Sequence, residues 1–268
     1  MTGAAAFLVS TLVTSTEHSR RKYDLLADRY EDLFFYVADL GRRLVDLAAP
    51  AAGDRVLDVG AGRGAVARAA LAAGCAVTAV DSSPGMCRRL AADHPTLTVR
   101  QCDAGALDVP DGSFDLVTAG FVVQVLDDPA RALAEFHRVL APGGRVAVSL
   151  ERQTVGRLGW LHELNRRYFG GGTGAEPMTA DQLDGLLTAA GFTAPARTGA
   201  HAPKTLDGPD RLWTWLGDQG LADAVAALPP ATAQRFRAEF HDGARRMHAE
   251  GGIVLEFGAT LHLAATPG

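Results

Sequence analysis

Residues 56–64 read Val56-Leu-Asp-Val-Gly-Ala-Gly-Arg-Gly64, an apolar stretch that passes directly into a glycine-rich turn. Apolar and β-branched residues in a short run such as 55–59 are typical of a strand covered on both faces. The alanine-rich segment 65–73 after the turn indicates a helix. Gly60 permits a tight turn, and Gly62 leaves no Cβ between the main chain and a ligand. Because the N-terminus of the helix offers unpaired N–H groups, we expect a nucleoside at this turn.

The same alternation of strand and helix continues along the 268 residues. Further strands are predicted at 76–80, 97–101, 114–118 and 145–150, and further helices at 83–93, 128–140 and 179–191. A sixth strand is expected from Phe192 onward, then helices at 209–216, 221–228 and 231–249, and a last strand at 253–264. Before the first strand, apolar residues at helical spacing over 16–48 predict two amphipathic helices broken near Asp32. No repeat and no separate domain boundary is evident, and the pattern predicts an α/β, doubly wound fold.

Two carboxylates decide which nucleoside is expected. Asp81 ends the second strand 21 residues after Gly60, where a carboxylate can accept hydrogen bonds from both ribose hydroxyls. Gly60, Gly62 and Ala65 alone also match the fingerprint of a dinucleotide site, so NAD remains an alternative. Asp58 lies two residues before Gly60, and its charge would repel a pyrophosphate in a partly desolvated cleft. The same charge would attract the ammonium and sulfonium groups of S-adenosylmethionine, which is therefore the favoured ligand.

Residues after the next two strands agree with this choice. Asp103 is placed to accept from the adenine amino group, with Met86 and Cys102 as apolar neighbours of the ring. Small residues such as Ala119 and Gly120 follow the fourth strand, where the methionine part of the ligand and a methyl acceptor must meet. Bulky side chains there would block transfer.

Composition excludes several classes of partner. The formal net charge is −5 and the pI is about 5.9, so the electrostatic attraction that nucleic-acid binding depends on is missing. The three cysteines are an odd number and form no CxxC pair, so no disulfide framework is indicated and a reducing cytoplasm is expected. No cluster of metal ligands is evident either, so no metal is expected. The apolar run 4–13 is too short to span a bilayer and is interpreted as an N-terminal extension, with a signal peptide as the alternative.

The chain resembles the class I S-adenosylmethionine-dependent methyltransferases of the small-molecule type, related to those of ubiquinone and menaquinone biosynthesis. The motifs that carry the resemblance are 56–64, Val80-Asp-Ser-Ser-Pro-Gly-Met86, Gln101-Cys-Asp-Ala104, Phe114-Asp-Leu-Val117 and Arg138-Val-Leu-Ala-Pro-Gly-Gly144. Tyr23-Asp-Leu-Leu-Ala-Asp-Arg-Tyr30 is similar to the helical segment that often closes over the cofactor in this family. The resemblance implies a Rossmann-like seven-stranded sheet with an antiparallel last strand. The order of segments is also similar to polyketide-tailoring O-methyltransferases of the aklanonic acid type.

One departure from the family concerns catalysis. Many relatives carry a His pair after the fourth strand, whereas this chain has Gln124-Val125, so no base is carried over and the catalytic residue is left unassigned. The residues expected to bind the cofactor are Tyr23, Asp58, Gly60, Ala61, Gly62, Asp81, Ser82, Met86, Cys102, Asp103, Ala104, Ala119 and Gly120. Those expected to bind substrate are Gln124, Trp160, His162, Tyr168 and His201. Packing is the alternative interpretation of the tyrosines, the tryptophans and the lone histidines.

These features predict methyl transfer from S-adenosylmethionine to a small molecule, by O-methylation of a secondary metabolite. The alternatives are a non-methylating enzyme of the cyclase or decarboxylase type that keeps the cofactor, an NAD-dependent oxidoreductase, and a silent partner subunit. Residues 1–50 are expected to form an N-terminal extension and helical cap. Residues 51–268 are expected to form the methyltransferase domain, with a helical substrate cover inserted at about 200–250. A monomer or homodimer without nucleic-acid or membrane partners is expected.

Overall fold

The computed structural model describes residues 15–152, 156–170 and 177–268, so the apolar run 4–13 lies outside the described residues. The chain divides into two compact units. We call the first the sheet unit, which comprises the described parts of 13–152, 176–200 and 259–268. The second, the helical unit, comprises the described parts of 153–175 and 201–258.

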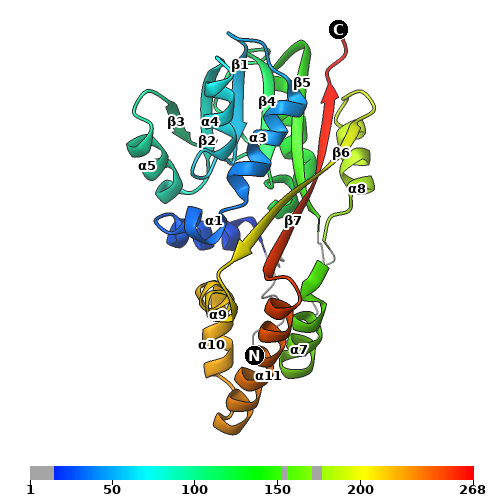
Figure 1. Cartoon of the computed structure of the whole chain (residues 1–268). Coiled ribbons are helices and arrows are strands. Elements are labelled where there is room, and N and C mark those ends of the chain that lie inside the picture. Colours follow the sequence, from blue (N-terminus) through cyan, green and yellow to red (C-terminus); the bar gives the residue numbers. More distant parts are fainter. Residues whose placement is uncertain (1–14, 153–155, 171–176) are drawn as a thin grey trace. The chain divides into compact units, whose positions relative to one another are not determined.

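The strands form a seven-stranded sheet in the order β3-β2-β1-β4-β5-β7-β6 (Figure 1). Strands β1, β2, β3, β4 and β5 pair in parallel, and β7 runs antiparallel to them. The predicted Rossmann-like sheet with an antiparallel last strand is therefore confirmed. The strands are β1 Arg55–Val59, β2 Ala76–Asp81, β3 Thr98–Gln101, β4 Phe114–Gly120, β5 Leu140–Arg152, β6 Ala196–Leu206 and β7 Ile253–Ala265.

The switch point of the sheet lies between β1 and β4, because the chain moves outward from β1 to β2 and β3 and then returns to the other side of β1. In open α/β sheets, ligands bind at the carboxyl ends of the strands beside such a switch point. The glycine turn after β1 and the segment after β4 both leave the sheet there.

Helices cover both faces of the sheet unit. Val146, Val148 and Leu150 on β5 belong to the core cluster that includes Leu133 and Leu183 of the helices α6 and α8. Successive side chains of a strand point to opposite faces, so Arg145 faces the other way, and its guanidinium donates to the Ala48 carbonyl at the end of α3. The helices concerned are α3 Val37–Ala48, α4 Ala65–Ala72, α5 Pro84–Asp93, α6 Pro129–Val139 and α8 Ala180–Ala189.

Residues 15–54, the described part of the chain before β1, contain three helices instead of the two predicted. They are α1 Thr16–Leu26, α2 Tyr30–Leu33 and α3. The chain leaves helical geometry at Phe34, with φ −116° and ψ 47°. Tyr30, Phe34 and Tyr36 pack in succession around this bend, with ring centroids 4.9 and 6.3 Å apart. The break predicted near Asp32 thus lies at Phe34, and a further break after Leu26 divides the first predicted helix into α1 and α2.

The helical unit has an aromatic core of its own. The ring centroids of Trp160 and Trp213 lie 5.6 and 4.9 Å from that of Phe240. Gly243 makes room for this packing, since a Cβ there would lie 2.3 Å from the Trp160 ring. The helices are η2 Gly156–Leu158, α7 Gly159–Phe169, α9 Pro209–Leu216, the π-helical η3 Gly217–Leu221, α10 Ala222–Ala226 and α11 Pro230–Ala249.

Two expectations about this part of the chain differ from the structure. The sixth strand begins at Ala196, because Phe192 instead packs into the core cluster with its ring 5.2 Å from that of His137. The strand also runs to Leu206, so the first residues of the segment expected as a helical cover at about 200–250 are strand, while the helix predicted at 209–216 is confirmed as α9. The helix α7 was not predicted.

Candidate cofactor site

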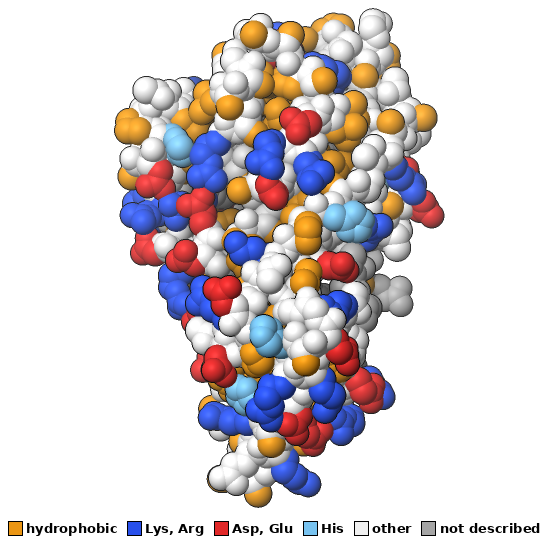
Figure 2. All heavy atoms as spheres, viewed as in Figure 1, with side chains coloured by type: hydrophobic (Ala, Val, Ile, Leu, Met, Phe, Trp, Pro, Cys, Tyr) orange, Lys and Arg blue, Asp and Glu red, His pale blue; other side chains and the backbone are white. Residues whose placement is uncertain are grey.

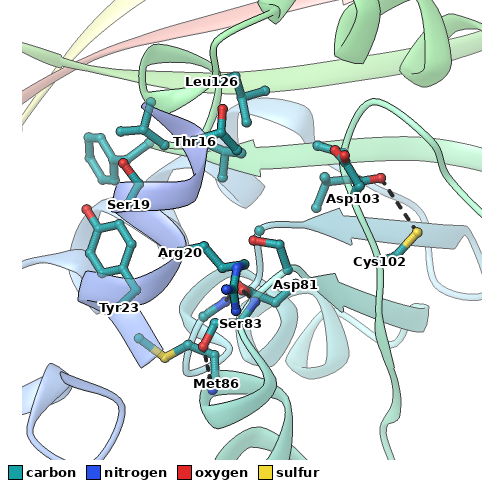
Figure 3. A pocket seen from close by; sticks show the side chains of 18 of the residues that line it. Thr16, Ser19, Arg20, Tyr23, Asp81, Ser83, Met86, Cys102, Asp103 and Leu126 are labelled. Atoms are coloured by element: carbon teal, nitrogen blue, oxygen red, sulfur yellow. Dashed lines mark hydrogen bonds between the residues drawn. The ribbon is translucent and has the colours of Figure 1, made fainter. Parts of the chain in front are cut away.

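A cavity of about 580 Å³ lies at the carboxyl ends of the central strands, within the sheet unit. This volume falls in the range of about 300–1,000 Å³ that is usual for small-molecule sites. Figure 3 shows side chains from α1, from the end of β2 and from the segments after β3 and β4 converging around it. The lining residues are Thr16, Glu17, Ser19, Arg20, Tyr23, Tyr30, Val59, Gly60, Gly62, Asp81, Ser82, Ser83, Met86, Gln101, Cys102, Asp103, Ala104, Gly120, Phe121, Val122, Val125, Leu126 and Asp127.

The two glycines of the turn serve different purposes. Both have a positive φ, +65° at Gly60 and +54° at Gly62. Residues with a side chain rarely adopt this backbone conformation. A Cβ at Gly60 would lie 2.3 Å from Val122, whereas a Cβ at Gly62 would meet nothing within 4 Å. Gly60 therefore allows the segment after β4 to pack on the turn, and Gly62 leaves the backbone open toward the cavity.

Asp81 is held at the end of β2 by two backbone donors. Its Oδ2 accepts from the Gly62 N–H at 2.8 Å, and its Oδ1 accepts from the Ser83 N–H at 2.8 Å. Burial raises the pKa of Asp81, while the N–H groups of Ser83, Gly62 and Ser82 act in the opposite direction. A carboxylate oxygen has more than one acceptor site, so both oxygens keep capacity for ribose hydroxyls.

Three further lining residues of the cavity are apolar, and we call them the apolar slot: Met86, which is almost fully buried, Cys102 and Ala104. Asp103 lines the cavity as well, with its Oδ1 accepting from the Gly105 N–H at 2.8 Å. A flat base between apolar side chains, with a carboxylate at its edge, fits this arrangement.

Helix α1 forms one wall of the cavity through Thr16, Ser19, Arg20 and Tyr23 (Figure 3). Of these residues only Tyr23 was expected from the sequence. A separation of three or four residues places side chains on one helix face, so the positions before Tyr23 could have been found from its own assignment. Arg20 is the one cationic side chain among the described residues that line the cavity, and it donates to Glu17 at 2.7 and 2.8 Å.

The Asp24 carboxylate holds α1 beside the cavity. Asp24 Oδ1 accepts from the Gly85 N–H at 2.6 Å and from the Ser83 hydroxyl at 3.0 Å. The approach is close, since a Cβ at Gly85 would lie 2.7 Å from the same oxygen. The N-terminus of α5 therefore positions α1.

Tyr23 and Tyr30 are the aromatic part of this wall. Their ring centroids are 6.0 Å apart in an edge-to-face arrangement. Burial raises the pKa of both phenols far above the usual value, so both hydroxyls stay protonated and can donate. Tyr30 was interpreted from the sequence as a packing residue, and it also lines the cavity.

Asp58 does not line the cavity, which corrects the expectation that its charge faces the ligand. Its side chain is only 1% exposed and lies between β4 and α4, where Oδ1 accepts from Thr118 Oγ1 at 2.8 Å and Oδ2 from the Ala67 N–H at 3.0 Å. Burial raises the pKa of Asp58 to about 7. Ala61 and Ala119 were also expected at the ligand and are likewise buried away from the cavity. Alternation along β1 and β4 turns the Asp58 and Ala119 side chains into the protein, whereas Ala61 lies in the turn after β1.

The predicted substrate residues are not among the residues that line this cavity. Gln124 is bonded to Glu151 beside it and is not a lining residue. In the helical unit, Trp160 packs on Phe240, and the Tyr168 hydroxyl donates to Glu239 at 2.6 Å. His162 and His201 are exposed. Their assignment to substrate binding stays a prediction.

The fold and the cavity define the class of protein: a Rossmann-like α/β protein with a small-molecule-sized cavity at the switch point of its sheet. Residues 57–148 match the family described as the methyltransferase domain. The chain is 31% identical over 220 residues to a malonyl-[acyl-carrier protein] O-methyltransferase of Halorhodospira halophila, covering 78% of this chain and 73% of that protein. The chain belongs to the class I S-adenosylmethionine-dependent methyltransferases of the small-molecule type, as the sequence motifs predicted. S-adenosylmethionine is its cofactor.

The chain is also similar to a second methyltransferase sequence and to a solved structure. A demethylmenaquinone methyltransferase of Thermus thermophilus is 42% identical over 135 residues, which are 47% of this chain and 60% of that protein. The matches to the first three curated relatives span 42 to 60% of their lengths. The crystal structure of the [4+2]-cyclase SpnF superposes with a TM-score of 0.58 at 21% identity, covering 94% of this chain and 96% of that one. This last likeness concerns the fold alone.

The described residues contain neither a cluster of metal ligands nor a helix that could span a membrane. Residues 15–152, 156–170 and 177–268 contain no group of three or more His, Cys, Asp or Glu side chains that could hold a metal ion. In the same part of the chain, no helix is both long and apolar enough to cross a membrane.

Proposed function

We propose that the chain transfers the methyl group of S-adenosylmethionine to a nucleophilic atom of a small molecule. The observation that carries the proposal is the cavity in which Asp81, tied to Gly62 and Ser83, stands beside an open glycine turn and an apolar slot. The bound cofactor supplies a methyl group on a positively charged sulfur, which makes that carbon electrophilic.

The residues of the cavity hold the adenosine part and the methionine part of S-adenosylmethionine. Asp81 accepts from the ribose hydroxyls, and Met86 and Cys102 contact the base. Arg20 pairs with the carboxylate of the methionine part, because it is the one cation among the described lining residues. Phe121 and Val122 bound the cavity after β4 and exclude water from it. Holding two reactants in contact in this way is worth up to roughly 7–11 kcal/mol of the barrier.

The finer proposal is O-methylation of a secondary metabolite. A relative that aligns with 78% of this chain is itself named an O-methyltransferase. Membership of the methyltransferase family argues against the NAD-dependent alternative. A cyclase or decarboxylase that keeps the cofactor remains the second candidate, since the fold is shared with a cyclase.

A labelling experiment separates these functions. The protein is incubated with S-adenosyl-L-[methyl-³H]methionine and the small-molecule fraction of an extract from its host, and the products are separated by chromatography. We expect tritium in a new small molecule whose mass is one methyl group larger than that of a compound consumed. A new product without label would favour the cyclase or decarboxylase. Stabilisation by NAD in preference to S-adenosylhomocysteine would contradict both.

The remaining expectations about partners stay predictions. On the face shown in Figure 2, acidic and basic side chains are interspersed, which does not favour nucleic acid as a partner there. The cytoplasmic location, the monomeric or homodimeric state, the helical cap over residues 1–50 and the substrate cover at about 200–250 are likewise untested.

A further inference from the structure

Glu151 lies near the carboxyl end of β5, the strand beside β4, and is not itself a lining residue, whereas the end of β4 and the segment after it line the cofactor cavity. Two residues earlier, Ser149 is paired with Gly120, a lining residue, and the Ser149 carbonyl and hydroxyl both accept from the Phe121 N–H at 3.1 and 3.0 Å. Residues two apart on a strand share a face, so Glu151 follows Ser149 on the face opposite the Leu150 side chain. The Glu151 carboxylate therefore lies at the carboxyl ends of β4 and β5, where the segment after β4 bounds the cavity.

Gln124 holds Glu151 in place from that same segment. Its Oε1 accepts from the Glu151 N–H at 2.7 Å, and its Nε2 donates to Glu151 Oε2 at 3.5 Å. Gln124 follows the lining residues Phe121 and Val122 and precedes Val125, which also lines the cavity. The amide therefore links the carboxylate to the cavity wall.

The surroundings of Glu151 suit a group that gains and loses a proton near neutrality. Burial raises its pKa to about 7, while the hydrogen bond from Gln124 and the charge of Lys22 act in the opposite direction. The phenols of Tyr23 and Tyr36 face it from the N-terminal helical region, and both feel its charge. Tyr23 also feels the charge of Asp81, so its phenol is within electrostatic range of both carboxylates.

We propose that Glu151 is the base that accepts the proton of a hydroxyl acceptor, with Gln124 as its positioning residue. This inference rests on the methyl transfer proposed above. The O–H bond of the acceptor breaks with its electron pair left on oxygen, and the proton passes to a Glu151 carboxylate oxygen. The acceptor oxygen forms a bond to the methyl carbon as the carbon–sulfur bond breaks with its electron pair left on sulfur. Glu151 then returns the proton to solvent.

The assignment narrows the substrate class. A carboxylate acceptor is already ionised near neutral pH and needs no base, whereas a phenolic or enolic hydroxyl does. Glu151 therefore indicates an acceptor that arrives as a neutral hydroxyl compound.

The test compares Glu151→Gln with Glu250→Gln, which makes the same change at an exposed residue after α11. Three quantities are measured: tritium transfer into the host small-molecule fraction from pH 5.5 to 9, affinity for S-adenosylhomocysteine by calorimetry, and the titration of the Glu151 carboxyl by ¹³C NMR. General-base catalysis contributes roughly 10²–10⁴-fold. We therefore expect Glu151→Gln to lower the transfer rate by at least 100-fold with cofactor affinity within twofold, and Glu250→Gln to leave both unchanged.

The pH profile and a second variant distinguish a base from a structural residue. The wild-type rate is expected to fall below pH 7 as Glu151 is protonated, and Glu151→Gln is expected to lose this dependence. Glu151→Asp keeps an acid and should keep the acidic limb at a reduced rate, which guards against a Glu151→Gln variant that does not fold. A Glu151→Gln rate within threefold of wild type, or a Glu151 carboxyl that titrates as an ordinary glutamate, would overturn the assignment and leave methyl transfer standing. Absence of label with the wild-type protein would overturn the proposed function and this inference together.

Discussion

Asp58 Oδ1 and Thr118 Oγ1 are 2.8 Å apart between β1 and β4, and this hydrogen bond lies below the cofactor turn instead of inside the cavity. The second oxygen of Asp58 accepts from the Ala67 N–H in the first turn of α4. One buried carboxylate thus joins β1, β4 and α4, the elements that meet around the glycine turn. Its contribution is to hold the turn in shape.

The buried position of Asp58 predicts a specific dependence of stability on pH. Its pKa of about 7 in the folded protein exceeds the usual value of 3.8. The stability linked to this carboxyl is therefore fully present below about pH 4 and is lost as the pH rises to about 7. The loss amounts to at most roughly 4 kcal/mol. Asp58→Asn stays neutral, so its free energy of unfolding relative to wild type should rise between pH 4 and 8 in chemical denaturation.

The control for this measurement is Asp46→Asn, at an exposed position of α3. Its free energy of unfolding should differ from that of wild type by an amount that does not change over the same pH range. An Asp58→Asn curve parallel to that of wild type would show that the carboxyl has an ordinary pKa in the folded protein.

The central sheet and the cofactor end of the site were predictable because their signals are local. The turn at Gly60 and Gly62, Asp81 at the end of β2 and Asp103 after β3 each follow a strand recognisable by its own residues, and parallel strands bring their carboxyl ends to one edge. Asp58 was misassigned because its charge was considered without the side-chain alternation of β1, which directs it toward α4.

The remaining features depend on contacts between distant residues. Helix α1 reaches the cavity because Asp24 binds the N–H of Gly85, 61 residues away. No periodic pattern in the sequence expresses such a contact. Glu151 was overlooked because its partner Gln124 lies 27 residues before it, in a segment that contains only a short 3₁₀ turn.

Asp81→Ala should weaken the binding of S-adenosylhomocysteine by about 2–4 kcal/mol, which corresponds to roughly 30- to 1,000-fold. The variant loses the acceptor for both ribose hydroxyls, and it also releases the Gly62 and Ser83 N–H groups that order the turn. Calorimetry measures the change, with Asp223→Ala on the exposed surface of α10 as the control. Wild-type affinity in a folded Asp81→Ala protein would remove Asp81 from the site.

Arg20→Ala should lower affinity only for ligands that carry the methionine carboxylate. A charged hydrogen bond is worth about 1.5–3 kcal/mol, so binding of S-adenosylhomocysteine should weaken roughly 10- to 150-fold. Binding of 5′-methylthioadenosine, which lacks the amino-acid part, should change by less than twofold. Arg21→Ala is the matched control, because Arg21 also pairs with Glu17, at 2.6 Å, but does not line the cavity. Equal losses for both ligands would place Arg20 at the nucleoside instead.

Alanine substitutions at Gly60 and Gly62 should affect different properties, stability at Gly60 and mainly cofactor binding at Gly62. Gly60→Ala places a methyl group 2.3 Å from Val122, in a backbone conformation with φ +65°. Overpacking of this kind costs about 1–3 kcal/mol, and the left-handed conformation adds roughly 1–2 kcal/mol. Gly62→Ala has a similar φ and no clash, so it should lose only the smaller amount of stability and instead weaken cofactor binding by obstructing the cavity.

A double-mutant cycle with Val122→Ala tests the steric part of this argument. Removing the Val122 methyl groups frees the space that the new side chain at residue 60 would occupy. The double variant Gly60→Ala/Val122→Ala should therefore be more stable than the sum of the two single changes predicts, by about 1–2 kcal/mol in chemical denaturation. The conformational cost stays, because φ at residue 60 is unchanged. Strictly additive effects would mean that the backbone of the turn shifts away from Val122 and that Gly60 is required for its conformation alone.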